Sequence, residues 1–185
     1  MSSLLTIMTE HWSVWLVAVT LVIAAVIDGL YLKVPNWLTI PMIATGWVFS
    51  FAVAGWSGLG WSLAGSVVGL ILLLIVYSIG GMGAGDVKLL AGIGAWLHVE
   101  HTFWIFIATT IVGGIMALVM IAVSGRWRKH FVQMQSIAEE IATVRDPEKL
   151  FEIAKERKPR MMLLPYGVPM TFAALGYFAT QGLLW

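Results

Sequence analysis

The sequence predicts an all-α integral membrane protein of about six transmembrane helices. Hydrophobic residues make up 59% of the 185 residues and charged residues only 11%, whereas a soluble domain carries roughly 25% charged residues. Apolar stretches close to the length that a spanning helix needs, about 20 residues, recur along the chain. The basic residues are confined to segments that six helices would place on one face. We therefore expect a single polytopic membrane domain over residues 1–185.

The expected helices follow one another at short intervals, with one long interruption. They cover residues 12–30, 37–54, 61–79, 86 to about 97, 102–124 and about 163 to 184. The interruption, residues 125–162, is too polar to span. No Lys or Arg precedes the first apolar stretch, whereas a cleaved signal peptide normally starts with a basic segment. We expect this first stretch to be retained as a helix.

The distribution of basic residues predicts the orientation, because cytoplasmic loops carry an excess of Lys and Arg. Lys33 follows the first helix and Lys88 follows the connection between the third and fourth. The other nine lie in the long interruption: Arg126, Arg128, Lys129, Arg145, Lys149, Lys155, Arg157, Lys158 and Arg160. Six helices place all three regions in the cytoplasm and both termini outside it. In a bacterium the protein would be a multi-pass protein of the inner membrane.

The long loop, residues 125–162, has a pattern of its own. Phe131, Met134, Ala138 and Ile141 follow helical spacing. The pair at 146 and 147, Asp-Pro, is typical of the start of a second short helix. Two interpretations stay open: an amphipathic helical hairpin lying on the lipid surface, or a platform for a partner or for the soluble part of a substrate.

Two aspartates are the candidate functional residues. Asp28 and Asp86 are the only carboxylates inside or at the edge of an expected span, and an ionisable group there suggests function. Both are expected at the cytoplasmic side. Two close carboxylates share a proton, which is what aspartic proteolysis requires. The structural alternative pairs Asp28 with Lys33 and Asp86 with Lys88.

A glycine-rich bend precedes Asp86. Residues 80–88 read Gly-Gly-Met-Gly-Ala-Gly-Asp-Val-Lys. Glycines permit positive φ angles and let another backbone approach closely, which suits a site that must hold an extended peptide. A nucleotide-binding loop is a poor alternative because the GxxxxGK[ST] pattern and a preceding strand are both missing.

Three motifs, in this order, resemble those of the type IV prepilin peptidases, a family of GxGD aspartyl proteases. Residues 83–90 read Gly-Ala-Gly-Asp-Val-Lys-Leu-Leu, which matches the GxGD motif and its extension. Asp28 followed by Val-Pro-Asn at 34–36 resembles the first catalytic aspartate and the turn after it. Residues 164–169, Leu-Pro-Tyr-Gly-Val-Pro, resemble the segment that starts the last helix of the family.

The resemblance implies a function and a set of residues. Prepilin peptidases remove the short basic leader of type IV prepilins and pseudopilins at the cytoplasmic face of the membrane. Asp28 and Asp86 carry over as the catalytic pair. Carried over as supporting or motif positions are Gly83, Gly85, Lys88, Pro35, Asn36, Pro165, Tyr166 and Gly167.

One departure narrows the expectation. Two-activity members have an N-terminal domain with paired zinc-binding cysteines and also methylate the new pilin N-terminus. This chain starts almost directly with its first helix and has no cysteine. It resembles the short branch that serves Flp (tight-adherence) pili, the CpaA/TadV type, so we expect peptidase activity without methylation. We expect no cofactor and no metal, and we expect contact with membrane lipid. We expect no nucleic-acid partner, because acidic residues nearly cancel the positive charge of the long loop. The sequence leaves the oligomeric state open.

The remaining features have simpler interpretations. His98, Glu100 and His101 could bind a metal, but their spacing favours loop residues. Most of the ten tryptophans, Trp96 among them, lie near expected span ends, where interfacial anchoring is typical. Four glycines are expected to permit close helix packing: Gly65, Gly69, Gly113 and Gly114. Two other functions compete: a small proton- or ion-coupled transporter using Asp28 and Asp86, and an assembly factor without catalysis.

Overall fold

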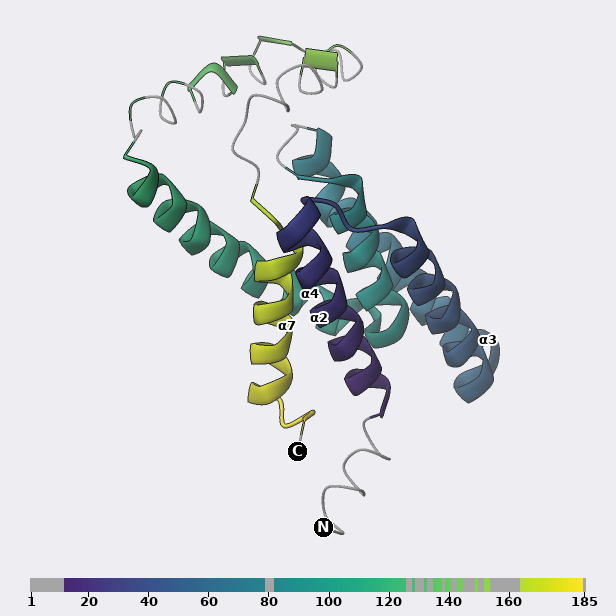
Figure 1. The fold of residues 1–185 in the computed structure, drawn as a ribbon. Coiled ribbons are helices and arrows are strands. Elements are labelled where there is room, and N and C mark those ends of the chain that lie inside the picture. Colours follow the sequence, from purple (N-terminus) through teal and green to yellow (C-terminus); the bar gives the residue numbers. More distant parts are fainter. Residues whose placement is uncertain are drawn as a thin grey trace.

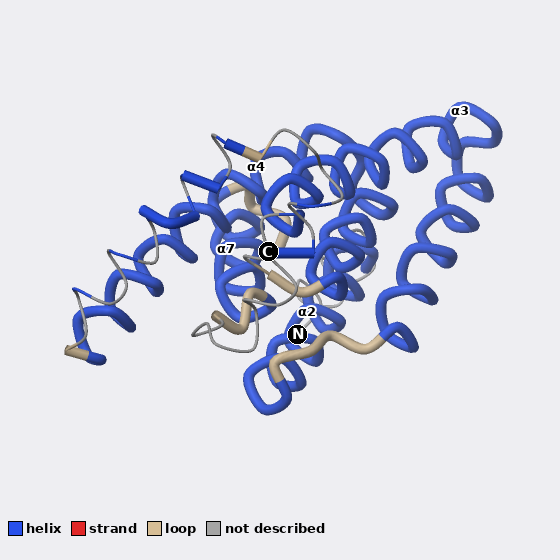
Figure 2. The backbone as a smooth tube through the Cα atoms, turned by 90° about the horizontal axis from the view of Figure 1, so that it is seen from above, coloured by secondary structure: helices blue, strands red, loops and turns tan. Residues whose placement is uncertain are grey.

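The computed structural model describes residues 12–78, 82–125 and 164–184, together with single positions between 128 and 153. The described residues form helices joined by short connections, and no strand occurs among them (Figure 2). The helices form one bundle (Figure 1). The all-α class is therefore confirmed. Most positions of the short helices that the sequence predicts in the long loop lie outside the described residues; among those described, residues 135–137, 139–140 and 152–153 are helical.

Three of the four continuous helices are long. They are α2 (Trp12–Tyr31), α3 (Asn36–Ser78) and α4 (Ala84–Ser124), and each is long and apolar enough to cross a membrane. The fourth, α7 (Gly167–Thr180), has 14 residues, fewer than the roughly 20 that span a bilayer. These lengths and their composition define an integral membrane protein.

Helix α3 reverses direction in its middle. Ala54 (φ −128°, ψ 15°) and Gly55 (φ 59°, ψ −145°) leave the helical conformation. The two legs then run side by side, and the indole N–H of Trp47 donates a hydrogen bond to Ser66 Oγ at 2.9 Å. The sequence predicts a loop over residues 55–60, but the helix resumes directly after Gly55. One glycine is sufficient because it adopts the positive φ that the turn requires.

Helix α4 breaks in the same way at His98 (φ 61°, ψ −170°). This conformation is close to a region that glycine occupies almost alone. The hydroxyl of Thr102 donates to the His98 carbonyl at 2.6 Å and restarts the helix. The sequence predicts a loop over residues 98–101, whereas the break is confined to one residue.

Helices α3 and α4 pack very closely where small residues meet. A Cβ atom built on Gly65 would lie 2.9 Å from the backbone carbon atoms of Gly94 and of His98. One on Gly69 would lie 2.6 Å from the carbonyl oxygen of Leu90. The expected role of Gly65 and Gly69 in close packing is therefore confirmed. Gly114 has open space at its Cβ position, so for that residue the expectation is wrong.

The crossing of α3 and α4 yields a stability prediction. Gly65→Ala forces a methyl group against backbone that cannot rotate away, so we expect the free energy of unfolding to fall by about 1–3 kcal/mol. Gly114→Ala adds the same methyl group in open space, and we expect no loss and a gain of up to about 1 kcal/mol from helix propensity. Unfolding in detergent micelles measures both. Equal effects of the two substitutions would contradict the close crossing.

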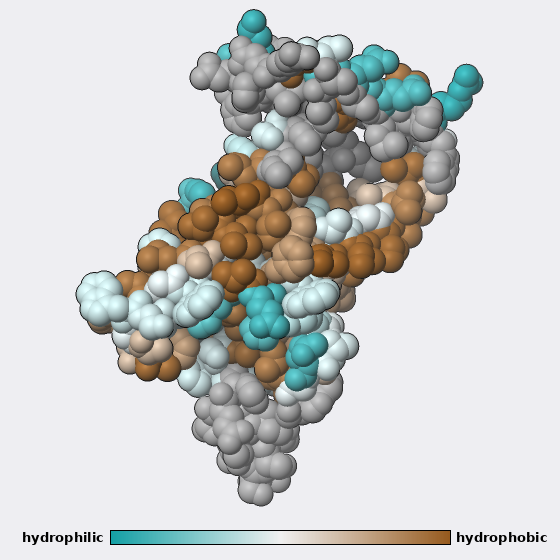
Figure 3. Space-filling view, turned by 180° about the vertical axis from the view of Figure 1, so that it is seen from behind, coloured by the Kyte–Doolittle hydropathy of each residue, from teal (hydrophilic) through white to brown (hydrophobic). Residues whose placement is uncertain are grey.

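The outer surface suits a lipid environment. Large apolar side chains are exposed on every long helix, for example Val26 at 57%, Ile71 at 55% and Val123 at 83%. Figure 3 shows apolar side chains across the middle of one face, with hydrophilic ones toward both ends. In water such a surface would drive aggregation, but in a bilayer it contacts acyl chains.

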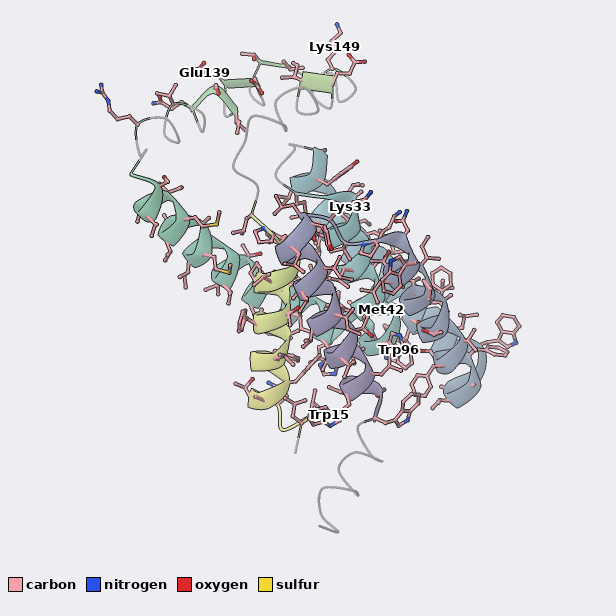
Figure 4. The ribbon with its side chains drawn as sticks, in the orientation of Figure 1. Trp15, Lys33, Met42, Trp96, Glu139 and Lys149 are labelled. Carbon is pink, nitrogen blue, oxygen red and sulfur yellow. The ribbon has the colours of Figure 1, made fainter. Side chains whose placement is uncertain are left out.

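Trp96 departs from the expected interfacial role. Its side chain is buried, its indole N–H donates to the Met42 carbonyl at 2.9 Å, and it stacks on Phe49. Figure 4 places Met42 and Trp96 together inside the bundle. Anchoring at the interface is therefore wrong for Trp96. Trp37, Trp56 and Trp61 are exposed on the surface, as an anchoring role requires.

Candidate functional site

The candidate site lies at one end of the bundle. Helix α2 ends there and helices α3, α4 and α7 begin there (Figure 1). Each motif of the sequence falls on one of these helix ends. The chain therefore gathers segments that are more than 130 residues apart.

Asp28 lies in the last turn of α2 and is only 2% exposed. The backbone N–H of Gly167, the first residue of α7, donates to its Oδ2 atom at 2.7 Å. A Cβ atom on Gly167 would lie 3.1 Å from both Asp28 Oδ2 and Asp28 Cβ. Glycine at 167 thus lets the backbone of α7 approach the carboxylate directly.

Asp86 lies in the first turn of α4 and is 5% exposed. The N–H of Gly83, the residue that caps this helix, donates to Asp86 Oδ2 at 3.0 Å. This is half of a capping box, in which the third residue of a helix bonds back to the cap. This structural role was not predicted from the sequence, although an acidic residue three positions after a cap glycine is a usable signal.

Gly85 is the point where two motifs touch. A Cβ atom there would lie 2.9 Å from Val34 Cβ and 3.1 Å from the Val34 carbonyl carbon, and closer still to the Val34 carbonyl oxygen. The close approach expected for this bend is confirmed at Gly85. Positive φ is not needed at Gly83, whose φ is −86°.

Two of the supporting motif residues, Lys88 and Asn36, are joined by a direct hydrogen bond. Lys88 Nζ donates to Asn36 Oδ1 at 2.8 Å, so the first residue of α3 is tied to the first turns of α4. Pro35 precedes Asn36 and its carbonyl accepts the N–H groups of Leu38 and Thr39. Pro35 therefore initiates α3.

The last motif begins α7 and contacts Asp28. Pro165 initiates α7, since its carbonyl accepts the N–H of Val168 at 3.1 Å. Tyr166 lies beside α4, because a Cβ atom built on Gly113 would meet its ring at 3.5 Å. Gly167 donates to Asp28.

A pocket of about 450 Å³ opens beside Asp86. One wall is the connection between α2 and α3, which includes Lys33 (Figure 4), and the other is the start of α4. Its lining is Tyr31, Leu32, Lys33, Val34, Asn36, Gly83, Ala84, Gly85, Asp86 and Lys88. The pocket combines one carboxylate, two ammonium groups and exposed backbone, and a peptide segment can contact all three.

His98 and His101 lie away from this site. His98 Nε2 is 3.4 Å from Ser50 Oγ, and His101 Nδ1 is 2.8 Å from the Tyr177 hydroxyl. Among the residues that the structure describes, no group of three or more His, Cys, Asp or Glu side chains could hold a metal ion.

The fold and this site define a helical membrane protein with two buried carboxylates at one end of its bundle. Residues 15–118 match the type IV leader peptidase family. The chain belongs to that family. Asp28 and the motifs at 34–36 and 83–90 lie inside the matched region, and the Pro165–Gly167 motif lies beyond it.

Curated relatives agree with this assignment. A prepilin leader peptidase/N-methyltransferase of Neisseria gonorrhoeae is 35% identical over 104 residues, which are 52% of this chain and 35% of that protein. One of Aeromonas hydrophila is 32% identical over 108 residues, 55% of this chain and 37% of that protein. The matched region thus spans little more than a third of each relative. No solved structure matches the chain.

Proposed function

We propose that the chain is a prepilin leader peptidase, an aspartyl endopeptidase that uses Asp28 and Asp86. The observation that carries the proposal is that two buried aspartates from distant parts of the chain lie at the same end of the bundle: Asp28 accepts the N–H of Gly167 at the start of α7, and Asp86 accepts the N–H of Gly83 at the start of α4. Family membership supports a peptidase, and the names of the relatives support prepilins as substrates.

The proposed chemistry requires the two carboxylates to share one proton. The ionised carboxylate takes a proton from water as the water oxygen attacks the peptide carbonyl carbon. The protonated carboxylate donates a hydrogen bond to the developing oxyanion, as paired aspartates do in aspartic proteases. A proton then passes to the amide nitrogen, the C–N bond breaks, and the leader carboxylate and the new amine are released.

The topology is part of the proposal. We propose that the two legs of α3 and of α4 cross separately, so that together with α2 and α7 they would make the six predicted crossings of a single domain over residues 1–185. Lys33 and Lys149 lie toward the same end of the molecule (Figure 4), which supports that end as the cytoplasmic face of an inner membrane. A reporter fused at residue 140 should report the cytoplasm, and a periplasmic signal would overturn this topology.

We further propose Flp-type prepilins as substrates and no N-methyltransferase activity. The lack of cysteine in the 185 residues and the resemblance to the short branch support both points. The assay combines purified protein in detergent with a Flp-type prepilin and follows leader loss by mass spectrometry. We expect the leader to be removed. In the presence of a methyl donor, we expect no further mass gain of roughly 14 Da, which one methyl group replacing a hydrogen would add. An uncut prepilin would contradict the peptidase proposal.

Lys88 and Asn36 offer a separate test. Lys88→Met removes the hydrogen bond to Asn36, and we expect cleavage to slow by about threefold to tenfold because the start of α4 loses a tie to α3. Asn36→Leu should have a similar effect, and the double variant should be no worse than either single one, since both remove the same contact. Lys33→Met is the control, because it removes charge from the same pocket and leaves this contact in place. Multiplicative losses in the double variant would contradict the coupling.

A further inference from the structure

Helix α7 needs something to set its position along α2. It has 14 residues, about 21 Å of helix at 1.5 Å per residue, so its length alone does not fix its depth in a bilayer. Yet its first residue must present a backbone N–H to Asp28. A slide of α7 by one residue would move that N–H by about 1.5 Å, enough to break a hydrogen bond of 2.7 Å.

A second polar contact joins the same two helices one turn further on. The hydroxyl of Thr171 donates to the carbonyl of Leu21 at 2.8 Å, and its oxygen also lies 2.8 Å from the Gly167 carbonyl. Thr171 is 6% exposed and Leu21 is fully buried. The contact therefore lies inside the bundle, where no water competes for the acceptor.

The two contacts lie at different points along both helices. Asp28 lies seven residues after Leu21, which is two turns of α2, and Thr171 lies four residues after Gly167, about one turn of α7. Gly29, the residue after Asp28, faces Val168, where a Cβ would meet the valine methyl group at an ordinary 3.8 Å. Two directional hydrogen bonds at different points along the same pair of helices therefore allow only one register of α7 on α2.

From this geometry we propose that Thr171 is a positioning residue for the aspartate site. Its hydroxyl locks the register of α7 on α2 and thereby holds the Gly167 N–H on Asp28. The role in cleavage rests on the proposed peptidase function, but the register lock does not. Thr171 lies outside the three family motifs. It acts on the candidate site only through Gly167, which donates to Asp28.

The test compares three variants with the wild-type protein in detergent. Thr171→Val keeps the shape and removes the hydroxyl, and we expect kcat on a prepilin to fall roughly tenfold to a hundredfold with KM unchanged. Thr171→Ser keeps the hydroxyl and should restore most of the activity. Thr109→Val is the matched control, because Thr109 is equally buried but bonds only to Ile105 of its own helix at 2.7 Å. Thr171→Ala replaces the valine variant if that protein does not fold.

A second readout is independent of peptidase activity. Thr171→Val and Asp28→Ala are combined, and Tm is measured for the wild type, both single variants and the double variant. If the two contacts act as one lock, the double variant loses less than the sum of the single losses. If the wild-type protein cuts no prepilin, the proposed function is wrong. The Tm values of the four proteins would still show whether the two contacts are coupled. Additive Tm losses, wild-type kcat in Thr171→Val, or equal damage in Thr171→Ser would each overturn the role of Thr171.

Discussion

Asp28→Asn and Asp86→Asn, made separately, are each expected to lower the rate of prepilin cleavage by roughly a thousandfold or more. A shared proton needs two carboxyl groups, and an amide can neither take the proton from water nor return it. Each variant therefore removes one half of the acid–base cycle. The measurement is leader removal from a prepilin under single-turnover conditions, so that slow residual cleavage is still resolved.

The choice of asparagine follows from the contacts of both side chains. Asp86 accepts the N–H of Gly83 and Asp28 accepts the N–H of Gly167, so alanine would remove helix-end hydrogen bonds as well as the charge. Asparagine keeps an acceptor oxygen of similar position. The variants should purify and unfold like the wild type, within about 1 kcal/mol. Wild-type cleavage by either folded variant would contradict the paired-aspartate mechanism and would favour another role for these carboxylates.

Gly85→Ala is expected to lower the rate of cleavage by about a hundredfold through geometry alone. The added Cβ would lie 2.9 Å from Val34 Cβ and closer to the Val34 carbonyl oxygen, so the start of α4 must move away from the connection between α2 and α3. Asp86 is the next residue and moves with it. A displacement near 1 Å at reacting groups costs about a hundredfold in rate, and overpacking adds roughly 1–3 kcal/mol of destabilisation.

Gly83→Ala is the matched control for Gly85→Ala. Gly83 has an extended conformation that alanine adopts freely, and its Cβ would meet only Asp86 Oδ2 at 3.2 Å within the tight range. We expect a loss of less than about tenfold, since a side-chain atom can shift by a few tenths of an ångström. Val34→Ala should not rescue Gly85→Ala, because the nearest atom is backbone. Equal losses at 83 and 85 would show that the motif glycines act through flexibility instead of close approach.

Much of the fold could be predicted because hydropathy and helix length are local properties. In lipid, every backbone N–H and C=O group must be hydrogen-bonded within the protein, so apolar stretches of spanning length become helices. The start of α2 and the end of α4 agree with the expected boundaries. The two reversals were expected as loops of several residues. They are sharper because the helices resume after Gly55 and His98, and histidine carries no sequence signal for a conformation that glycine normally supplies. The count of six crossings stays a prediction.

The candidate site could be predicted as a set of residues but not as a set of contacts. Family membership, now established, was recognisable from short motifs because each motif is a continuous run. The catalytic roles of the site residues, the Flp-type substrate and the lack of methylation stay predictions for this chain. The supporting residues were only motif positions, whereas the structure places Gly85 against Val34 and Lys88 against Asn36.

The sequence by itself determined the helical membrane class and the family, and it singled out two aspartates as candidates, because these depend on composition and on residues adjacent in the chain. Only the tertiary structure decided how the ends of four helices meet. The bond from Gly167 to Asp28 joins positions 139 residues apart, and the bond from Thr171 to Leu21 joins positions 150 apart. No local pattern encodes the register between α2 and α7. It depends on directional hydrogen bonds between residues that only the folded bundle brings together.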